Sequence, residues 1–297
     1  IANTGGTLYT TTAGTSNFRA GKNAGDGILL NGNYNTVVGD EAGTAITTGD
    51  QNTALGYKAA VSLVDSSNVT AIGYQSNFFN TSAGATVVGS NAGVYNNSGA
   101  NSTFIGFQAG QGIDGTRLTG DNNTAVGKDA GLLLQGTATA NTLLGAAAGD
   151  NITTGDSNII IGTSIDAASP TADGQLNIGG WITGLAGKIG IGEADPDNRL
   201  DVDLSITGEG SQEGGIKIQN SHGENADIAP LYFGVHGFTR RTKAAIGLKR
   251  TGSFGVGDLI FAVDSNTDDA NVTFANDEKM RIDSSGNLLV GKTSGSI

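Results

Sequence analysis

The sequence contains no cysteine, a single methionine and few charged residues. Without cysteine, the chain can form neither a disulfide framework nor a thiolate metal site. Lys, Arg, Asp and Glu make up only 15% of the residues, and no apolar run approaches the ~18 residues of a membrane-spanning helix. The net charge of −12 disfavours binding to nucleic acid or to an anionic membrane. We therefore expect no nucleic-acid partner, no membrane insertion and no cofactor.

Glycine is abundant instead, with 49 residues, and ten of them recur at intervals of 16 to 21 residues. We call these ten the marker glycines: Gly21, Gly39, Gly56, Gly73, Gly89, Gly106, Gly127, Gly145, Gly162 and Gly179. A similar short motif surrounds each of them. Its most complete copies are Asn-Thr-Ala-Leu-Gly at 52–56 and Asn-Thr-Ala-Val-Gly at 123–127. A repeat of this length predicts stacked coils, and hence an all-β chain built on a parallel β-roll or β-solenoid.

The two residues before each marker glycine are mostly apolar, such as Val37 and Val38 before Gly39. Because successive side chains of a strand point to opposite faces, one solenoid interior can bury only one of the two. The other face needs a partner, and for a repeated structure a second copy of the chain is the simplest one. The pattern therefore predicts a homo-oligomer, and we expect a homotrimer.

A second glycine stands seven residues before several marker glycines, in turn-like phrases such as 48–50 and 154–156. We expect each coil to contain a strand, an Ala-Gly corner, a second short strand and a Gly-Asp turn. The turn acids Asp50, Asp121 and Asp156 recur at one coil position and are a candidate column for Ca²⁺. The nonapeptide of calcium-binding β-rolls is absent, so we interpret each acid as an Asx cap and predict no metal site.

The composition divides the chain into a lead-in at 1–16, the repeat region at 17–180, a neck or connector at 181–203 and a C-terminal β-rich domain at 204–297. Lys and Arg mark the change, with 5 of the 16 in residues 1–180 and 11 beyond. Short strand-like runs predict an antiparallel β-sandwich or a trimeric β-knob in the last segment, at 215–219, 231–235, 244–248, 258–263 and 271–274. Because Met280 is the only methionine, we expect the chain to be a processed product or a piece of something longer.

The phrase Asn-Thr-Ala-Val-Gly-Lys-Asp-Ala-Gly at 123–131 resembles the head repeats of trimeric autotransporter adhesins, and more closely the version found in bacteriophage tail-fibre proteins. The resemblance covers about 17–180, and the segments 177–202 and 278–291 also resemble parts of phage fibres. It implies three left-handed parallel β-rolls packed about a common axis, in an extracellular virion fibre. Its implied partners are further copies of the chain, other tail-fibre or baseplate proteins, and a host cell-surface glycan or protein receptor.

Three patterns that could indicate chemistry have better structural interpretations. The run 187–192, Gly-Lys-Ile-Gly-Ile-Gly, lacks the following helix of a nucleotide-binding loop. Ser221, His222 and Asp227 could be forced into a triad, and His236 lies near Arg240, but no nucleophile elbow or oxyanion loop accompanies them. We predict no catalytic residue and a chain that is not an enzyme.

A threonine stands three residues before seven of the marker glycines. These residues are Thr36, Thr53, Thr70, Thr86, Thr103, Thr124 and Thr142. A flat threonine column could bind ice, but threonine is also a good strand residue that pairs with itself across strands, and the column is single, with no Thr-x-Thr pair in it. We favour the strand interpretation.

One basic island stands in this acidic chain, from His236 to Arg250. Its candidate receptor contacts, with the aromatic residues beside them, are Tyr232, Phe238, Arg240, Arg241 and Lys243. They could grip an anionic sugar or a receptor carboxylate, with aromatic rings stacking on the ligand. Charge runs are usually solvated, so we favour a strand face that balances nearby acids such as Glu224 and Asp227.

These observations favour a structural and receptor-binding component of a phage tail fibre, a trimeric rod that gains affinity through multivalency. A bacterial trimeric surface adhesin is the alternative within the same class. The alternative of another class is a glycan-depolymerising tailspike, which would need a carboxylate pair in a groove that no spacing singles out.

Overall fold

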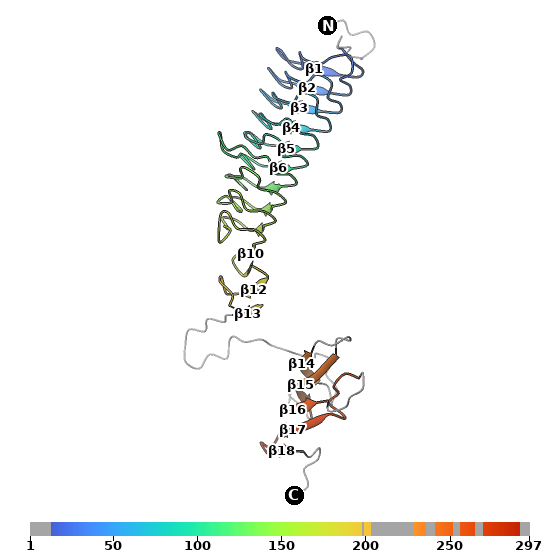
Figure 1. Ribbon diagram of the computed structural model, residues 1–297, viewed down its shortest axis with the longest axis vertical. Helices are drawn as coiled ribbons and strands as arrows, with labels where there is room; N and C mark the ends of the chain where they lie inside the picture. The colour runs from blue at the N-terminus through green and yellow to red at the C-terminus, as the bar shows by residue number, and fades with distance from the viewer. Residues whose placement is uncertain are drawn as a thin grey trace. The chain divides into compact units, whose positions relative to one another are not determined.

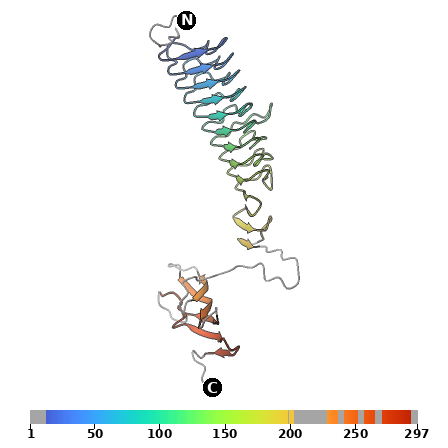
Figure 2. The same ribbon diagram turned by 180° about the vertical axis from the view of Figure 1, so that it is seen from behind.

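The structure is a computed structural model that describes residues 13–197, 199–202, 228–235, 241–251, 256–264 and 270–291. The chain divides into two compact units, Ile1–Ser205 and Ile206–Ile297 (Figures 1 and 2). All regular elements within the described ranges are β-strands, and these ranges contain no apolar helix of membrane-spanning length. The predicted all-β fold class is confirmed.

The first unit contains a sheet of thirteen described strands that follow one another in chain order. Ten of them are the predicted repeat strands. Each is three residues long and ends directly before a marker glycine. They are β1 (Phe18–Ala20), β2 (Thr36–Val38), β3 (Thr53–Leu55), β4 (Thr70–Ile72), β5 (Thr86–Val88), β6 (Thr103–Ile105), β7 (Thr124–Val126), β8 (Thr142–Leu144), β9 (Ile159–Ile161) and β10 (Leu176–Ile178). Each pairs in parallel with the next, and equivalent residues stand opposite one another, as Thr53 does with Thr70. This is the predicted parallel β-solenoid.

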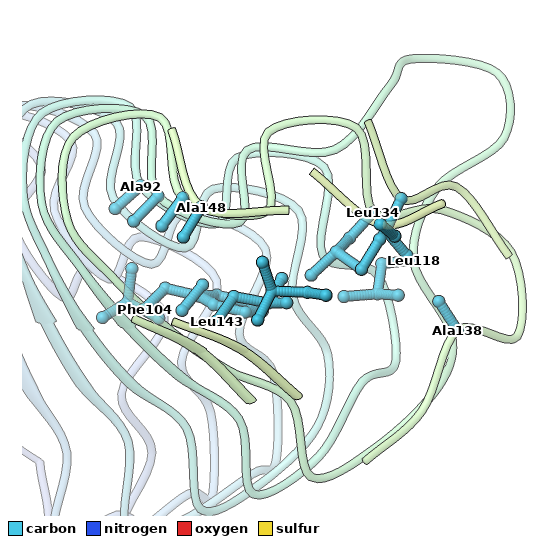
Figure 3. Close-up of a cluster of buried hydrophobic side chains, with 14 of the residues drawn as sticks. Ala92, Phe104, Leu118, Leu134, Ala138, Leu143 and Ala148 are labelled. Carbon is cyan, nitrogen blue, oxygen red and sulfur yellow. The ribbon is translucent and has the colours of Figure 1, made fainter. Parts of the chain in front are cut away.

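The middle residue of these strands points into the solenoid. Val37, Phe104 and Leu143 are fully buried, as is every residue at this position from β2 to β9. In Figure 3, Phe104 and Leu143 face the corner alanines Ala92 and Ala148 across the core. The Ala-Gly corner therefore works as predicted, because only a small side chain leaves room for the strand residue opposite.

The predicted second short strand is wrong for the described coils. The chain there runs through tight turns, and the amide of Ile46 donates to the carbonyl of Gly43 in its own coil at 3.1 Å. This local bond closes a four-residue turn and keeps the segment out of the extended conformation of a strand. Bonds between coils nevertheless recur along this side, such as Gly43 N–H to the carbonyl of Ala59 at 2.8 Å and Thr47 N–H to the carbonyl of Val64 at 2.7 Å.

The marker glycines stack backbone on backbone. At Gly89 φ is +144°, and a Cβ atom there would lie 2.1 Å from the carbonyl oxygen of Gly106, the next marker. Gly56 has the same arrangement, with a Cβ position 2.4 Å from the oxygen of Gly73. Real Cβ atoms do not come this close to another atom, so the repeat requires glycine both for conformation and for space.

Buried asparagines join successive coils, four residues before the marker glycines. The Asn141 side-chain oxygen accepts from the backbone amide of Asn158 at 3.0 Å, and its Nδ2 donates to the carbonyl of Gly155 at 2.9 Å. Both partners belong to the following coil. The members of this asparagine ladder are Asn17, Asn35, Asn52, Asn123, Asn141 and Asn158. Sequence reasoning missed the ladder, although the recurring asparagine of the repeat phrase was its signal.

Replacing Asn141 with alanine is expected to destabilise the solenoid by about 2–4 kcal/mol. The substitution leaves the amide of Asn158 and the carbonyl of Gly155 buried without their partners, and each such group costs about 1–3 kcal/mol. Denaturant unfolding followed by circular dichroism measures the change. Alanine at the exposed Asn31 is the control, and an equal effect of the two substitutions would contradict a structural role for the ladder.

The last three strands of the first unit are β11 (Ile182–Leu185), β12 (Lys188–Ile191) and β13 (Leu200–Val202). β11 pairs antiparallel with β10 and β12, and β13 pairs in parallel with β12. The glycine-rich run at 187–192 therefore contains a sheet strand, as the structural interpretation predicted. The lead-in predicted at 1–16 lies outside the described residues except for 13–16.

The second unit contains an antiparallel sheet of five described strands in chain order. They are β14 (Ile228–Val235), β15 (Arg241–Arg250), β16 (Gly257–Val263), β17 (Glu278–Ile282) and β18 (Leu288–Val290). Ala245, Ala262 and Val272 form its small buried cluster, and Phe274 packs against them. The prediction of an antiparallel β-rich domain is confirmed.

One predicted strand of the second unit is wrong, and another cannot be placed. Residues 271–273 have no regular structure, and 274–276 form a turn, which the Asp277 carboxylate closes by accepting from the Thr273 amide at 2.8 Å while the Asp277 amide donates to the Thr273 carbonyl at 3.0 Å. The strand predicted at 215–219 lies outside the described residues.

Candidate interaction surfaces

The outer face of the solenoid sheet carries an unbroken aliphatic column. It consists of the residues directly before the marker glycines: Val38, Leu55, Ile72, Val88, Ile105, Val126, Leu144, Ile161 and Ile178. In the single chain, Leu55 is 44% exposed and Ile105 is 39% exposed. The structure confirms that each repeat strand from β2 to β9 has an apolar residue on both faces, and that the solenoid interior fully buries only one of them.

The aliphatic column continues beyond the repeats. Ile178 stands opposite Ile182, Ile182 opposite Ile191, and Ile191 opposite Val202. The column therefore crosses from the parallel coils into the antiparallel strands β11 and β12 without changing face. An apolar strip of this length in an isolated chain marks an interaction surface.

The predicted threonine column lies beside the aliphatic column on the same outer face. Consecutive threonines stand opposite one another from Thr36 to Thr142, and Ile159 takes the position in the next coil. The threonines therefore border the apolar strip, and Ile159 widens that strip in the next coil.

Two exposed tyrosines stack on each other just after the repeat strands. The rings of Tyr57 and Tyr74, each directly after a marker glycine, stack with centroids 5.7 Å apart. The ammonium of Lys58 lies 5.2 Å from the ring of Tyr57 and 3.5 Å from the carboxylate of Glu41. Its hydrogen bond to Tyr57, followed by the charge of Glu41, raises the pKa of Lys58.

The turn acids bond between coils, which corrects their interpretation as Asx caps. The carboxylate of Asp50 accepts from the backbone amide of Asn33 at 2.7 Å, and that of Asp121 accepts from Ala100 at 2.8 Å. Asp156 accepts from Thr139 in the same way at 2.8 Å. Each carboxylate thus holds the preceding coil, and the described residues contain no cluster of three potential metal-binding side chains.

Asp150 has an acidic neighbour in the coil on either side, Asp129 and Asp166. Burial raises the pKa of Asp150, and hydrogen bonding to Asp166 and the charges of Asp166 and Asp129 raise it further. A carboxyl with a raised pKa stabilises the fold while it is protonated, and that contribution is lost as the pH rises through its folded-state pKa.

Replacing Asp150 with asparagine is therefore expected to raise the melting temperature at pH 7. Asparagine stays neutral, so the gain over the native chain shrinks as the pH falls below the raised pKa toward 3.8, the ordinary value for this group. Thermal unfolding between pH 3.5 and 7 tests this. Asparagine at the exposed Asp65 controls for the loss of one negative charge, and a gain that is the same at every pH would contradict the proposed cause.

The predicted receptor contacts are only partly within the described residues. Tyr232 lies in β14, is 49% exposed and has its ring 6.3 Å from that of Phe274. The ammonium of Lys243, in β15, lies 2.6 Å from the buried carboxylate of Asp264 and 3.0 Å from the carbonyl of Ala270. Lys243 thus takes part in a structural ion pair.

The other predicted contacts cannot be assessed in the same way. Phe238 and Arg240 lie outside the described residues, and only the backbone of Arg241 is described, at the start of β15. Ser221, His222, Asp227 and His236 also lie outside the described ranges. The hypothesis of a receptor grip by the basic island stays a prediction.

A cluster that sequence reasoning missed lies on the 21-residue coil between Gly106 and Gly127. The guanidinium carbon of Arg117 lies 3.6 Å from the centroid of the Phe79 ring, and Phe79 stacks on Tyr95 with centroids 5.7 Å apart. Asp114 lies 3.3 Å from Arg117 in the same loop. We call Phe79, Tyr95, Asp114 and Arg117 the aromatic–arginine cluster. The long coil was visible in the sequence, but its contact with two earlier coils was not.

Comparison with models of known protein families, with curated proteins and with solved structures finds no match. The class of the protein therefore follows from the chain itself. It is a repeat protein with a parallel β-solenoid of ~17-residue coils and a separate unit with an antiparallel sheet.

Proposed function

We propose that the chain is a structural and receptor-binding component of a bacteriophage tail fibre, in which three copies pack along a common axis. The single observation that carries this proposal is the aliphatic column, which runs over one face of the sheet from Val38 to Val202. The strip has one aliphatic residue in every coil. A second copy of the chain that runs in the same direction carries the same strip at the same spacing, so the two strips can pack along their whole length. The resemblance of the repeats to phage fibres supports the assignment to a virion.

The structural role follows from the way in which the coils are joined. Glycine stacking, the asparagine ladder and the turn carboxylates each link a coil to its neighbours, so the solenoid is held by short-range bonds repeated along its length. Such a unit is suited to act as a spacer that presents loops and a C-terminal domain to a host surface. A bacterial trimeric adhesin would use the same surface.

Sedimentation equilibrium of the purified chain tests the proposal. We expect a species of three times the 29.7 kDa chain mass at micromolar concentration, and a monomer would overturn it. Incubation with bacterial polysaccharides separates the proposal from the tailspike alternative. We expect no release of oligosaccharides, and their release would favour a depolymerase.

A further inference from the structure

Two neighbouring coils depart from the repeat at the same position. The seventh residue after the marker glycine is a core aliphatic in other coils, such as Ile46, Leu63 and Ile152. In the fourth and fifth coils this position is occupied by Asn80 and Asn96, both of which are buried. Polar side chains stand at a core position here, although protein interiors usually bury apolar side chains.

Aromatic residues occupy the outside of the same coils. Phe79 and Tyr95 stand one residue before Asn80 and Asn96, and both are partly exposed. Phe78 packs edge-on against Phe79, with ring centroids 4.6 Å apart. The chain thus places amides inside and aromatic rings outside, and local departures of this kind concentrate at functional sites.

The aromatic pair holds Arg117 in place. Its guanidinium lies over the ring of Phe79 and is paired with Asp114, while the other end of the stack is Tyr95 on the next coil. An arginine fixed in this way loses little side-chain freedom when it binds a ligand. The group is therefore preorganised at the surface.

A hollow of about 470 Å³ opens beside this arginine. It is lined mainly by polar residues: Asn97, Asp114, Gly115, Thr116, Arg117, Thr119 and Gly136. The lining combines hydrogen-bond donors, acceptors and hydroxyls that serve as both. A ligand of this site must itself both donate and accept over several adjacent atoms.

We propose that the aromatic–arginine cluster and this hollow form a binding site for a neutral saccharide. Each sugar hydroxyl donates and accepts, so neighbouring hydroxyls can donate to Asp114 and accept from Arg117. Asp114 and the net charge of −12 oppose a polyanionic ligand. The inference rests on the proposed receptor-binding function, for which it names a ligand class and a place on the solenoid.

The test applies the full chain to immobilised oligosaccharides, neutral ones of hexoses and N-acetylhexosamines and acidic ones bearing sialate, uronate or phosphate. Calorimetric titration with the tightest-binding neutral oligosaccharide then compares variants. We expect Arg117→Ala and Asp114→Asn each to weaken binding at least about tenfold, through loss of hydrogen bonds to charged groups. Arg19→Ala, which removes an ion-paired arginine on the first coil, is expected to leave binding unchanged.

Three results would overturn the inference: no binding of any oligosaccharide, binding of acidic oligosaccharides only, or neutral binding that survives both cluster variants. Because Asp114 is exposed, Asp114→Asn keeps the test decisive if Arg117→Ala fails to fold. Sedimentation of the same sample separates the two proposals. A trimer that does not bind saccharide would contradict the saccharide site alone. A monomer that binds saccharide would contradict the trimeric fibre alone.

Discussion

If the proposed trimer forms, replacing Ile105 with aspartate is expected to convert it into folded monomers. Ile105 lies in the middle of the aliphatic column and is 39% exposed in the single chain, so a carboxylate there stays hydrated while the chain is alone. In the trimer three carboxylates would face the common axis without partners. Each buried, unpaired charge costs several kcal/mol, so we expect the association constant to fall by more than about a thousandfold.

Sedimentation velocity measures the loss of the trimer, and circular dichroism shows whether the monomer retains its β-structure. Aspartate at Leu30 is the matched control, because Leu30 is 81% exposed and is not part of the column. A trimer that survives Ile105→Asp, or an equal loss with Leu30→Asp, would show that the copies do not meet at the aliphatic column.

Replacing Gly89 with alanine is expected to destabilise the solenoid by about 4–6 kcal/mol, the largest effect on folding of any change considered. Alanine would be strained at a φ of +144°, and its Cβ would lie 2.1 Å from the oxygen of Gly106. Backbone strain costs about 1–3 kcal/mol and overpacking about 1–3 kcal/mol. The upper part of the combined range applies because the clash is with backbone, which cannot rotate away.

Alanine at Gly174 separates strain from collision. Gly174 also has a positive φ, of +64°, but nothing lies within 4 Å of its Cβ position. We expect this variant to lose only about 1–2 kcal/mol, the cost of the left-handed conformation. Denaturant unfolding of both variants measures the difference, and equal losses would show that backbone stacking of the marker glycines contributes nothing.

Much of the solenoid could be predicted from local pattern. Val37 and Val38 show why, because alternation of side chains along a strand requires that one of two adjacent apolar residues point outward. The second strand of each coil was predicted wrongly, because a turn closed by the bond from Ile46 to Gly43 bends the chain there, although neighbouring amides still bond to the next coil. No spacing rule in the sequence shows that this segment turns.

The side chains that join the coils show where pattern reasoning ends. Asp50 and Asn141 both belong to recurring phrases, and their recurrence is visible in the sequence. Aspartate bonds readily to its own turn, so Asp50 was interpreted as a cap, and the role of Asn141 was missed. Only the stacked structure shows that Asp50 holds the coil before it and that Asn141 holds the coil after it.

The sequence by itself determined the coil, the strand within it and the existence of a second apolar face. These properties depend on neighbours within a few residues and on a constant period, which the order of residues shows directly. Only the tertiary structure decided which distant side chains meet. Phe79, Tyr95 and Arg117 come from three different coils, and stacking those coils at the spacing of paired strands is what brings a ring, a second ring and a guanidinium together.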